Sequence, residues 1–396
     1  MTRSGGGRNL TEVLKGVRVV ELGTMITAPL AGMILADFGA DVVKVERPDG
    51  GDPFRSFRGG LYSPHFIAFN RNKRSVALDL QTEAGKASLR ALLAQADVLL
   101  DNYRSGVMDR LGLSAEFIRT EYPKLIWCSI TGFGADGPYA GRPAYDAVAG
   151  ALSGLAGVML DPEMPQASGP TIADNVTGMY AACGILGALY EREKTGRGRR
   201  IETNMLEAAV SFVPDAFSNF TRMQIDNLPR TRVATSQSYA FRCSDGKLLA
   251  LHLSSPQKFW ESLVDVIERP DLKTDVRFAT RDGRVRNYAI LEKELAAAIG
   301  RKGRPYWMAK LDSADVPFAP VQTVPEVLDD PQIKHLGTFY QQAHPTEGPL
   351  TLIHRPILID GNRDIQSRPP PTLGEHTSEI LQELSAMRSN PETQKP

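Results

Sequence analysis

The sequence predicts an α/β protein, with a large open sheet of parallel strands and a smaller α+β domain. Three observations lead to this fold class. The chain of 396 residues is too long for one ordinary hydrophobic core, so two domains are expected. It opens with a strand–helix–strand pattern, which is typical of parallel sheets. From about residue 226 the pattern changes to an antiparallel hairpin and short helices.

The first domain is expected to begin with two strands joined by a helix. The strands are predicted at 15–22 and 42–46, and the helix at 30–38. The turn between the first strand and the helix lacks the glycines of a dinucleotide site, so a nicotinamide cofactor is not expected. The alternation continues with strands at 75–80, 97–101 and 125–130, and with a helix from about 82 to 95.

The second domain is expected to contain a β-hairpin, because Asp245 and Gly246 separate two β-rich runs. Helices are predicted at 256–267 and 288–299, and a proline-rich strand at 316–321. We expect the chain to divide into three segments: a large α/β domain at 12–225, a small α+β domain at 226–325, and a return segment at 326–396 that completes the large domain and carries an amphipathic helix at 378–387.

Composition argues against several classes of function. The 46 basic and 46 acidic residues give a formal net charge of zero, which argues against non-specific binding to nucleic acid or to anionic membranes. The longest uncharged run near the middle is too short for a membrane span, and the first ten residues do not resemble a signal peptide. The three cysteines are far apart and the histidines are scattered, which suits a reducing compartment and argues against a metal site. We expect a cytoplasmic protein.

The loop at 169–178 runs into a helix rich in small residues and carries one carboxylate, Asp174. One interpretation is that Asp174 caps the helix by accepting a backbone N–H of the first turn. The other is that these N–H groups keep Asp174 ionised in an apolar setting, where a carboxylate is a nucleophile. The stretch alone does not separate the two interpretations.

Three polar or basic sets are expected near the carboxyl ends of strands, where open α/β sheets bind ligands. Arg47 directly follows a strand and suits a phosphate or a stacked purine. Together the sets predict a site for a multiply phosphorylated ligand. They lie around Arg47, around Lys73 and Arg74, and around Asn102, Arg104 and Arg110.

Five blocks of the sequence resemble the class III CoA-transferases (the CaiB/BaiF type), a family that includes formyl-CoA:oxalate and carnitine CoA-transferases and the 2-methylacyl-CoA racemases. The resemblance spans about 15 to 360, nearly the whole chain, and the blocks follow the family's order and spacing. The resemblance identifies the family but says much less about the substrate. The blocks are Val19–Pro48, Phe69–Leu80, Asn102–Gly112, Thr131–Pro138 and Asp174–Gly178.

The resemblance implies a large open α/β domain built from both ends of the chain, a small domain, and a homodimer of two interlocked rings. It implies CoA as a thioester substrate, with no tightly bound cofactor, and a carboxylic acid as the acceptor. The family's catalytic carboxylate falls on Asp174. The family's CoA contacts fall on Ile26, Thr27, Arg47, Leu78 to Gln81, Asn102, Tyr103 and Arg110.

The implied reaction moves CoA from an acyl-CoA thioester to a free carboxylic acid. Ionised Asp174 would attack the thioester and form an aspartyl–acyl anhydride, which CoA converts into an aspartyl-CoA thioester. All the nucleophiles are anions, so no strong base is required. The reaction needs exclusion of water and N–H groups for the oxyanions, which the start of the 175–190 helix is expected to supply.

Racemisation is the main alternative within the family, and it needs an acid/base pair on opposite faces of the α-carbon. The racemases use a histidine of a Gly-His-Asp motif, whereas this chain has Ala144, Tyr145 and Asp146 there, so transfer is favoured. Tyr145 and Asp146 are then candidates for the substrate side of the site. A second alternative is a CoA-binding protein without activity, which would not need Asp174.

The chain departs from the formyl/oxalate enzymes after residue 225, where their glycine-rich lid is missing. Arg230 or Arg232 of this segment either binds an acceptor carboxylate or is an ordinary surface arginine. A basic CoA contact of the family near Pro143 has no match, although Arg142 is adjacent. The sequence therefore does not identify the acyl donor or the acceptor.

Overall fold

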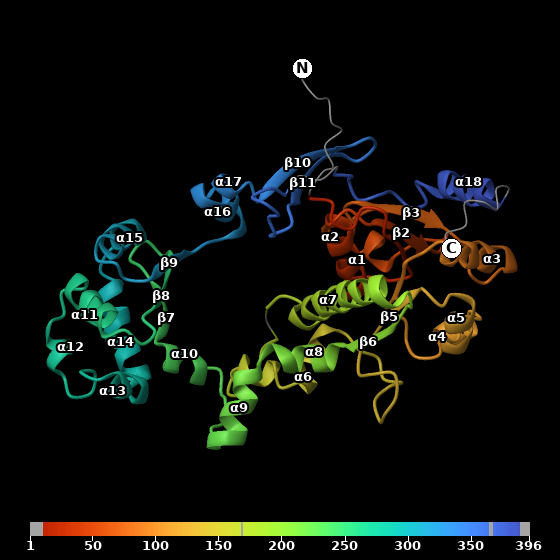
Figure 1. Cartoon of the computed structure of the whole chain (residues 1–396). Helices are drawn as coiled ribbons and strands as arrows, with labels where there is room; N and C mark the ends of the chain where they lie inside the picture. The colour runs from red at the N-terminus through yellow and green to blue at the C-terminus, as the bar shows by residue number, and fades with distance from the viewer. Residues whose placement is uncertain (1–10, 168, 364–366, 389–396) are drawn as a thin grey trace. The chain divides into compact units, whose positions relative to one another are not determined.

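The computed structural model describes residues 11–167, 169–363 and 367–388, and the chain forms two compact units (Figure 1). Unit 1 takes the chain up to Ala156, then Ala167–Pro214, and then the part from Gly337 onward. Unit 2 takes Gly157–Gln166 and Asp215–Leu336. The boundaries expected at 226 and 325 both fall inside unit 2.

Unit 1 contains a sheet of six parallel strands, which confirms the predicted α/β class (Figure 1). Their bounds are β1 Arg18–Glu21, β2 Asp41–Glu46, β3 Lys73–Ala77, β4 Val98–Asp101, β5 Ile126–Thr131 and β6 Arg200–Asn204. The order across the sheet is β3-β2-β1-β4-β5-β6. In β1, Val19 lies between Val42 of β2 and Val98 of β4, which fixes the register at the centre.

Helices cover both faces of this sheet, as a buried parallel sheet requires. The covering helices are α1 Thr27–Asp37, α3 Glu83–Leu93, α5 Ala115–Glu121, α7 Ile172–Thr195 and α18 Thr377–Arg388. Val19 and Leu100 pack with α1 and α7, whereas Val20 and Leu99 pack with α3, α5 and α18. The alternation follows from the two-residue period of a strand.

Shorter elements complete unit 1. Its other helices are α2 Pro64–Phe69, α4 Val107–Arg110, α6 Asp146–Leu152 and α8 Met205–Phe212. The chain also has 3₁₀ turns at Pro53–Ser56 and Ala156–Val158, and an antiparallel hairpin of β10 Phe339–His344 and β11 Gly348–Ile353. Arg74 of β3 pairs with Glu379 and Glu383 of α18, so both ends of the chain contribute to unit 1.

Helix α7, with 24 residues, is the one described helix that is long and apolar enough to cross a membrane. It packs along α1 and against β5, β6 and α8. Small residues such as Gly178, Ala181 and Ala182 are buried in these contacts and allow close approach. We therefore interpret α7 as the central helix of unit 1.

Unit 2 is built around an antiparallel sheet of β7 Ser238–Arg242, β8 Leu248–His252 and β9 Phe318–Val321. β7 and β8 form the predicted hairpin, and Gly246 in its turn has φ +78°, a value that favours glycine. The helices from Pro214 onward are α9 Pro214–Met223, α10 Thr231–Ser236, α11 Gln257–Val266, α12 Asp271–Thr274, α13 Arg281–Arg286, α14 Tyr288–Ile299, α15 Arg304–Ser313, α16 Val324–Asp329 and α17 Pro331–Leu336.

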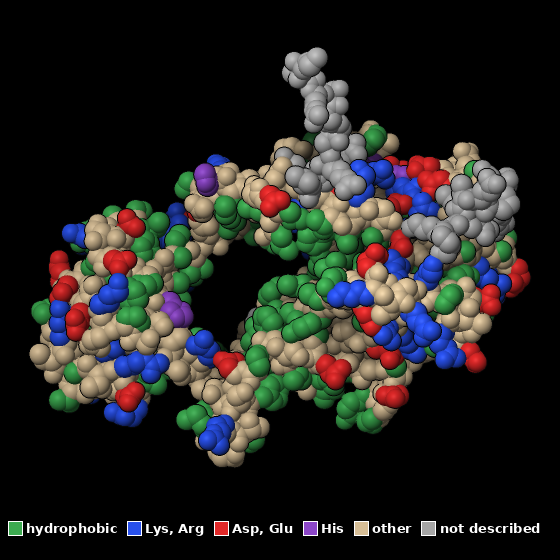
Figure 2. Space-filling model, viewed as in Figure 1, with side chains coloured by type: hydrophobic (Ala, Val, Ile, Leu, Met, Phe, Trp, Pro, Cys, Tyr) green, Lys and Arg blue, Asp and Glu red, His purple; other side chains and the backbone are tan. Residues whose placement is uncertain are grey.

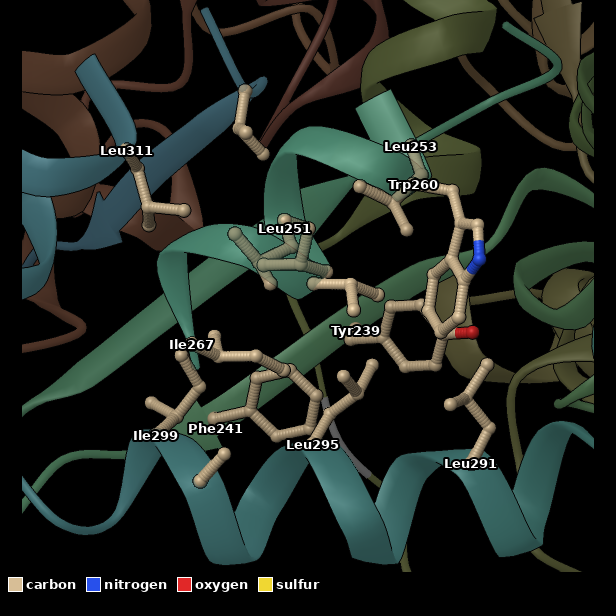
Figure 3. Close-up of a cluster of buried hydrophobic side chains, with 14 of the residues drawn as sticks. Tyr239, Phe241, Leu251, Leu253, Trp260, Ile267, Leu291, Leu295, Ile299 and Leu311 are labelled. Carbon is tan, nitrogen blue, oxygen red and sulfur yellow. The ribbon is translucent and has the colours of Figure 1, made fainter. Parts of the chain in front are cut away.

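The core of unit 2 is apolar. Leu291, Leu295 and Ile299 lie at four-residue spacing along α14 and pack toward Tyr239 and Phe241 of β7 (Figure 3). The predicted helices at 256–267 and 288–299 are confirmed as α11 and α14. These elements were predictable because their apolar residues repeat with the helical period.

Candidate functional site

The strand order of unit 1 reverses between β1 and β4. From this point β2 and β3 extend in one direction, and β5 and β6 in the other. In open α/β sheets, a crevice forms at the carboxyl ends of such strands and ligands bind there. A pocket of about 190 Å³ lies at this place, lined by Thr24–Thr27 after β1 and by Asn102–Ser105 after β4.

Asp174 lines the same pocket from α7. The N-cap of α7 is Thr171 and the helix begins at Ile172, so Asp174 is the third residue of the helix. Within the described part of the chain, the Asp174 carboxylate accepts no hydrogen bond from the first turn. The interpretation of Asp174 as the N-cap is therefore wrong, and its side chain is available to the pocket.

Close packing of α7 on α1 brings Asp174 near the first turn of α1. Gly178 lies one helical turn after Asp174, on the same face of α7. A Cβ atom at Gly178 would lie 2.7 Å from the carbonyl oxygen of Thr27, so a larger residue does not fit without a shift of backbone. The first N–H groups of a helix have no helical partner and carry partial positive charge. Asp174 therefore stands near the positive end of α1.

A second carboxylate, Asp146, holds the backbone of Asp174. Its Oδ1 atom, at the start of α6, accepts the backbone N–H of Asp174 at 3.0 Å. Burial, and to a smaller extent the charge of Asp146, raise the pKa of Asp174 to about 7. The carboxylate is thus poorly solvated, yet it is ionised above neutral pH.

Among the described residues, no N–H group at the start of α7 donates to the Asp174 carboxylate, so the expected means of keeping it ionised is not observed. Two of those groups are engaged elsewhere. The N–H of Asp174 donates to Asp146, and the N–H of Asn175 donates to the carbonyl oxygen of Thr171 at 3.2 Å. Burial is therefore the larger of the two causes that raise the pKa of the Asp174 carboxylate.

Asn102 uses its side-chain amide to fix the turn after β1. Its Oδ1 accepts the backbone N–H of Thr24 at 2.9 Å. Its Nδ2 donates to the Thr24 carbonyl oxygen at 2.8 Å and to Oγ1 of Thr27 at 2.9 Å. Both amide protons are therefore engaged, so Asn102 joins the ends of β1 and β4 across the point where the strand order reverses.

The structure brings most of the predicted site residues together. The ones that line the pocket are Ile26, Thr27, Asn102, Tyr103, Tyr145 and Asp174. The ones that do not are Arg47, Leu78, Gln81, Arg110 and Asp146. Arg47 directly follows β2 and Leu78 directly follows β3, so both lie at the carboxyl edge of the sheet that also holds the pocket.

The prediction that Lys73 and Arg74 belong to the ligand site is wrong. They are the first residues of β3, and so they lie at the amino end of the strand. Lys73 is fully buried with its Nζ 2.9 Å from Glu21, and Arg74 pairs with Asp41 at 2.7 Å. Both charges are neutralised inside the fold.

Sequence reasoning missed several residues of the pocket, above all Arg142. Its guanidinium lies 4.0 Å from the centre of the Tyr139 ring. Arg104 lines the same pocket, and neither arginine forms an ion pair with a carboxylate among the described residues. Arg104 belonged to one of the predicted ligand sets, and Arg142 carried the same signal, because it too follows a strand whose carboxyl end faces the pocket. The other missed lining residues include Thr24, Met25, Thr131 and Met205.

Arg230 and Arg232 lie in unit 2, and each pairs with a carboxylate of that unit. Arg230 pairs with Glu292 and lies over the ring of Tyr288 at 5.2 Å. Arg232 pairs with Asp215 at 3.2 Å. Both charges are already engaged, which favours the surface-arginine interpretation over binding of an acceptor carboxylate.

Comparison with known proteins agrees with a pocket for CoA chemistry. A model of CoA-transferase family III matches residues 14–377. Succinyl-CoA:glutarate CoA-transferase of Mus musculus is 32% identical, over 94% of this chain and 86% of its own length. Acetyl-CoA:oxalate CoA-transferase of Acetobacter aceti is also 32% identical, over 94% of this chain and 95% of its own length.

The fold has solved relatives too. The crystal structure of a CAIB/BAIF family protein from Brucella suis is 32% identical and superposes with a TM-score of 0.83, covering 94% of this chain and 99% of that protein. The names of the sequence relatives above are those of transferases, so the racemase alternative is not favoured.

Proposed function

The chain belongs to CoA-transferase family III and is a CoA-transferase, and we propose that Asp174 bonds first to the donor's acyl group and then to CoA, which it passes to the acceptor. One observation supports this role above the others. Asp174 is a partly buried carboxylate with a pKa near 7, in a pocket at the point where the strand order reverses. Little water solvates such a carboxylate, so its ionised form is a reactive nucleophile.

The first half of the proposed reaction releases the donor acid. A carboxylate oxygen of Asp174 attacks the thioester carbonyl carbon, the C–S bond breaks, and CoA leaves as a thiolate. The product on the enzyme is an aspartyl–acyl anhydride. The thiolate then attacks the aspartyl carbonyl carbon and displaces the donor carboxylate, which leaves an aspartyl-CoA thioester.

The second half runs the same steps with the acceptor. Its carboxylate attacks the aspartyl thioester and displaces the CoA thiolate, forming a new anhydride. The thiolate attacks the acceptor's acyl carbon, which gives the new acyl-CoA and frees the Asp174 carboxylate. Every nucleophile and leaving group is an anion, so the cycle balances without a proton donor or a cofactor.

Each tetrahedral intermediate of this cycle carries an oxyanion that needs hydrogen-bond donors. We assign that role to the backbone N–H groups of Thr27 and Ala28, the first two residues of α1, which lie beside the α7 face that carries Asp174. The next two residues offer none, because Pro29 has no N–H and the N–H of Leu30 donates to the carbonyl oxygen of Ile26 at 2.7 Å. The positive end of α1 would also stabilise the negative charge that moves between Asp174 and the thiolate. Tyr145, which is exposed at the pocket, is placed on the substrate side.

We propose that CoA lies along the carboxyl edge of the sheet. The predicted contacts come from four neighbouring strands: Leu78 after β3, Arg47 after β2, Thr27 after β1 and Tyr103 after β4. Three strand spacings amount to about 14 Å, which suits an elongated ligand. Arg47 and Arg110 would then bind the phosphates, and the thioester would enter the pocket of Asp174.

We propose that the enzyme is a homodimer. On α7, Met179, Tyr180 and Tyr190 are about half exposed or more, and Figure 2 shows hydrophobic side chains gathered over α7 and α8. On α9, Phe220 and Met223 are similarly exposed. Apolar patches of this kind are usually covered by a partner. Light scattering should give twice the chain mass of 43.3 kDa, and a monomer at micromolar concentration would argue against this proposal.

The reaction is tested by a transfer assay in deuterium oxide. Formyl-, acetyl-, succinyl- and branched acyl-CoA are each paired with a panel of free acids, and the products are weighed by mass spectrometry. We expect at least one pair to give a new acyl-CoA without deuterium at its α-carbon. Asp174→Ala should lose this transfer and still bind CoA in calorimetry.

The alternatives give different results in the same assay. Deuterium at the α-carbon without a new acyl-CoA would contradict the transfer mechanism and point to racemisation. Transfer that persists in Asp174→Ala would remove Asp174 from the chemistry. Binding of CoA with neither transfer nor exchange would support a protein that only binds CoA.

A further inference from the structure

The turn that lines the pocket after β1 has a strained backbone. Met25 has φ +64°, in the left-handed region that a residue with a Cβ atom rarely adopts. Such strain persists only where the surroundings impose it, and it is most common at functional sites. The next residues, Ile26 and Thr27, line the pocket and enter α1, so the direction of α1's first turn depends on this conformation.

Two buried charges outside the pocket impose the conformation of Met25. Nζ of Lys44 donates to the carbonyl oxygen of Gly23 at 2.7 Å. The carboxylate of Asp52 accepts the backbone N–H of Met25 at 3.1 Å. Lys44 and Asp52 pair with each other at 2.9 Å. With Asn102 holding Thr24 between them, three consecutive residues of the turn are fixed from behind.

The pair is fully withdrawn from solvent. Lys44 and Asp52 are 0% and 1% exposed, and Nζ of Lys44 also contacts Glu21 at 3.0 Å. Burial alone would raise the pKa of Asp52, but the charge of Lys44 and the N–H groups of Phe54 and Met25 lower it below its ordinary value. Both partners are therefore charged at neutral pH.

Stability alone gives little reason for this arrangement. A buried ion pair is often no more stabilising than apolar residues of the same size, because removing two charges from water is costly. Hydrogen bonds, unlike apolar contacts, fix the direction of the groups they join. Here the charged group of Lys44 holds Gly23 and that of Asp52 holds Met25, so the pair fixes the two ends of one strained turn.

We infer that Lys44 and Asp52 are positioning residues for the transfer reaction, which hold the turn Gly23–Thr27 and thereby aim the first N–H groups of α1 at the carbon that Asp174 attacks. This inference rests on the proposed function. Neither residue lines the pocket, so their action is through the turn.

The test compares two substitutions at one position with a control at the other end of α1. Asp52→Ala removes the acceptor for the N–H of Met25, whereas Asp52→Asn keeps one acceptor oxygen and removes the charge. The control is Asp37→Asn. Asp37 is the last residue of α1, is 3% exposed and pairs with Arg71, so it is a similarly buried ion pair about 15 Å away along the helix.

Two quantities are measured for each variant. The first is the rate at which the donor acid is released in a single turnover, divided by the number of active sites that an acyl-CoA labels. The second is the hydrogen–deuterium exchange of the peptide that covers residues 23–27. Counting active sites separates a slower reaction from a smaller folded fraction.

Asp52→Ala should slow release of the donor acid per site by about ten- to a hundredfold, since a misplacement of about 1 Å has effects of this size. The rate per site should fall less in Asp52→Asn. KM for the thioester should change much less than the rate. Exchange at 23–27 should rise in Asp52→Ala. Asp37→Asn should melt at a lower temperature with its rate per site within about twofold and its exchange at 23–27 unchanged.

Two results overturn the inference in distinguishable ways. If the wild-type enzyme transfers CoA and Asp52→Ala keeps the full rate per site, Lys44 and Asp52 serve the fold alone. If no thioester labels Asp174 in the wild-type chain, the proposed mechanism itself fails, and the positioning role fails with it.

Discussion

Two regions of the molecule bury different kinds of side chain. In unit 1, behind the pocket turn, Lys44, Lys73, Glu21 and Asp52 form a cluster of ion pairs that is closed to solvent. In unit 2, the core around Leu295 consists of aliphatic and aromatic side chains from three strands and several helices (Figure 3). The chain therefore fills its interior in two ways, with ion pairs in one region and with apolar side chains in the other.

The difference shows what each region must do. Burial of apolar surface stabilises the folded state by about 25 cal/mol per Å² and does not depend on how the side chains are oriented, so it suits a region that needs stability. Ion pairs and hydrogen bonds contribute less on balance but fix atoms in place. Unit 1 uses them where a strained turn lies beside the candidate nucleophile.

The largest effect is expected from Asp174→Ala. Loss of the nucleophile should lower transfer by about a thousandfold or more, because the covalent path is closed. Folding should be little affected, since the carboxylate accepts no hydrogen bond among the described residues and is held partly away from water. Initial rates and the melting temperature check this prediction, and a variant with a tenth of normal activity would refute it.

The apolar core of unit 2 is tested by Leu295→Ala. Leu295 is fully buried, so its truncation should lower the free energy of unfolding by about 2–5 kcal/mol. The matched control is Ile290→Ala on the same helix, where the side chain is 45% exposed and the change should be within about 0.5 kcal/mol. Denaturant titration measures both. Equal losses at the two positions would break the contrast between the units.

The pH dependence of transfer tests the influence of Asp146 on Asp174. Attack needs the ionised carboxylate, so kcat/KM should fall as the pH drops through about 7. Asp146→Asn keeps an oxygen for the N–H of Asp174 and removes the charge. The acid limb should then move to lower pH, yet stay above the ordinary aspartate range, because burial is the larger cause.

Asp146→Ala provides the comparison for this experiment. It removes the charge and the hydrogen bond together, so the limb should move as in Asp146→Asn while the maximal rate falls further. An acid limb that does not move in either variant would mean that Asp146 acts only by holding the backbone.

The smallest effect is expected from Arg142→Gln. Arg142 lines the pocket of Asp174 without a carboxylate partner among the described residues, so it suits a second carboxylate on the substrate. With a fixed donor, kcat/KM for a dicarboxylic acid acceptor should fall about tenfold relative to a monocarboxylic acid of equal length. A uniform loss with both acceptors would instead place Arg142 on CoA.

Local patterns were enough to predict several parts of the molecule. Asp245 and Gly246 indicated the hairpin of unit 2, and the apolar spacing at 288–299 indicated α14, because both depend on neighbours in sequence. Asp174 stood out because a single carboxylate precedes a helix of small residues. The stretch could not decide whether Asp174 caps the helix or stays ionised, because that depends on burial and on Asp146, 28 residues earlier.

Other parts depend on the order of the strands, which no local pattern contains. The bond from Lys44 to Gly23 and the bonds between Asn102 and Thr24 require β1 to lie between β2 and β4. Lys73 was assigned to a ligand because a basic cluster looks the same whether solvent, phosphate or Glu21 neutralises it. Only the burial of this cluster distinguishes these cases, and a local sequence pattern does not show burial.

The central claim is that Asp174 becomes covalently attached to the substrate. The direct measurement is to mix the enzyme with an acyl-CoA that supports transfer, quench with hydroxylamine, and weigh the peptide that covers residues 170–190. We expect a hydroxamate on Asp174 in the wild-type enzyme and none in Asp174→Ala. Transfer without any hydroxamate on this peptide, at a time when the donor acid has been released, would contradict the account.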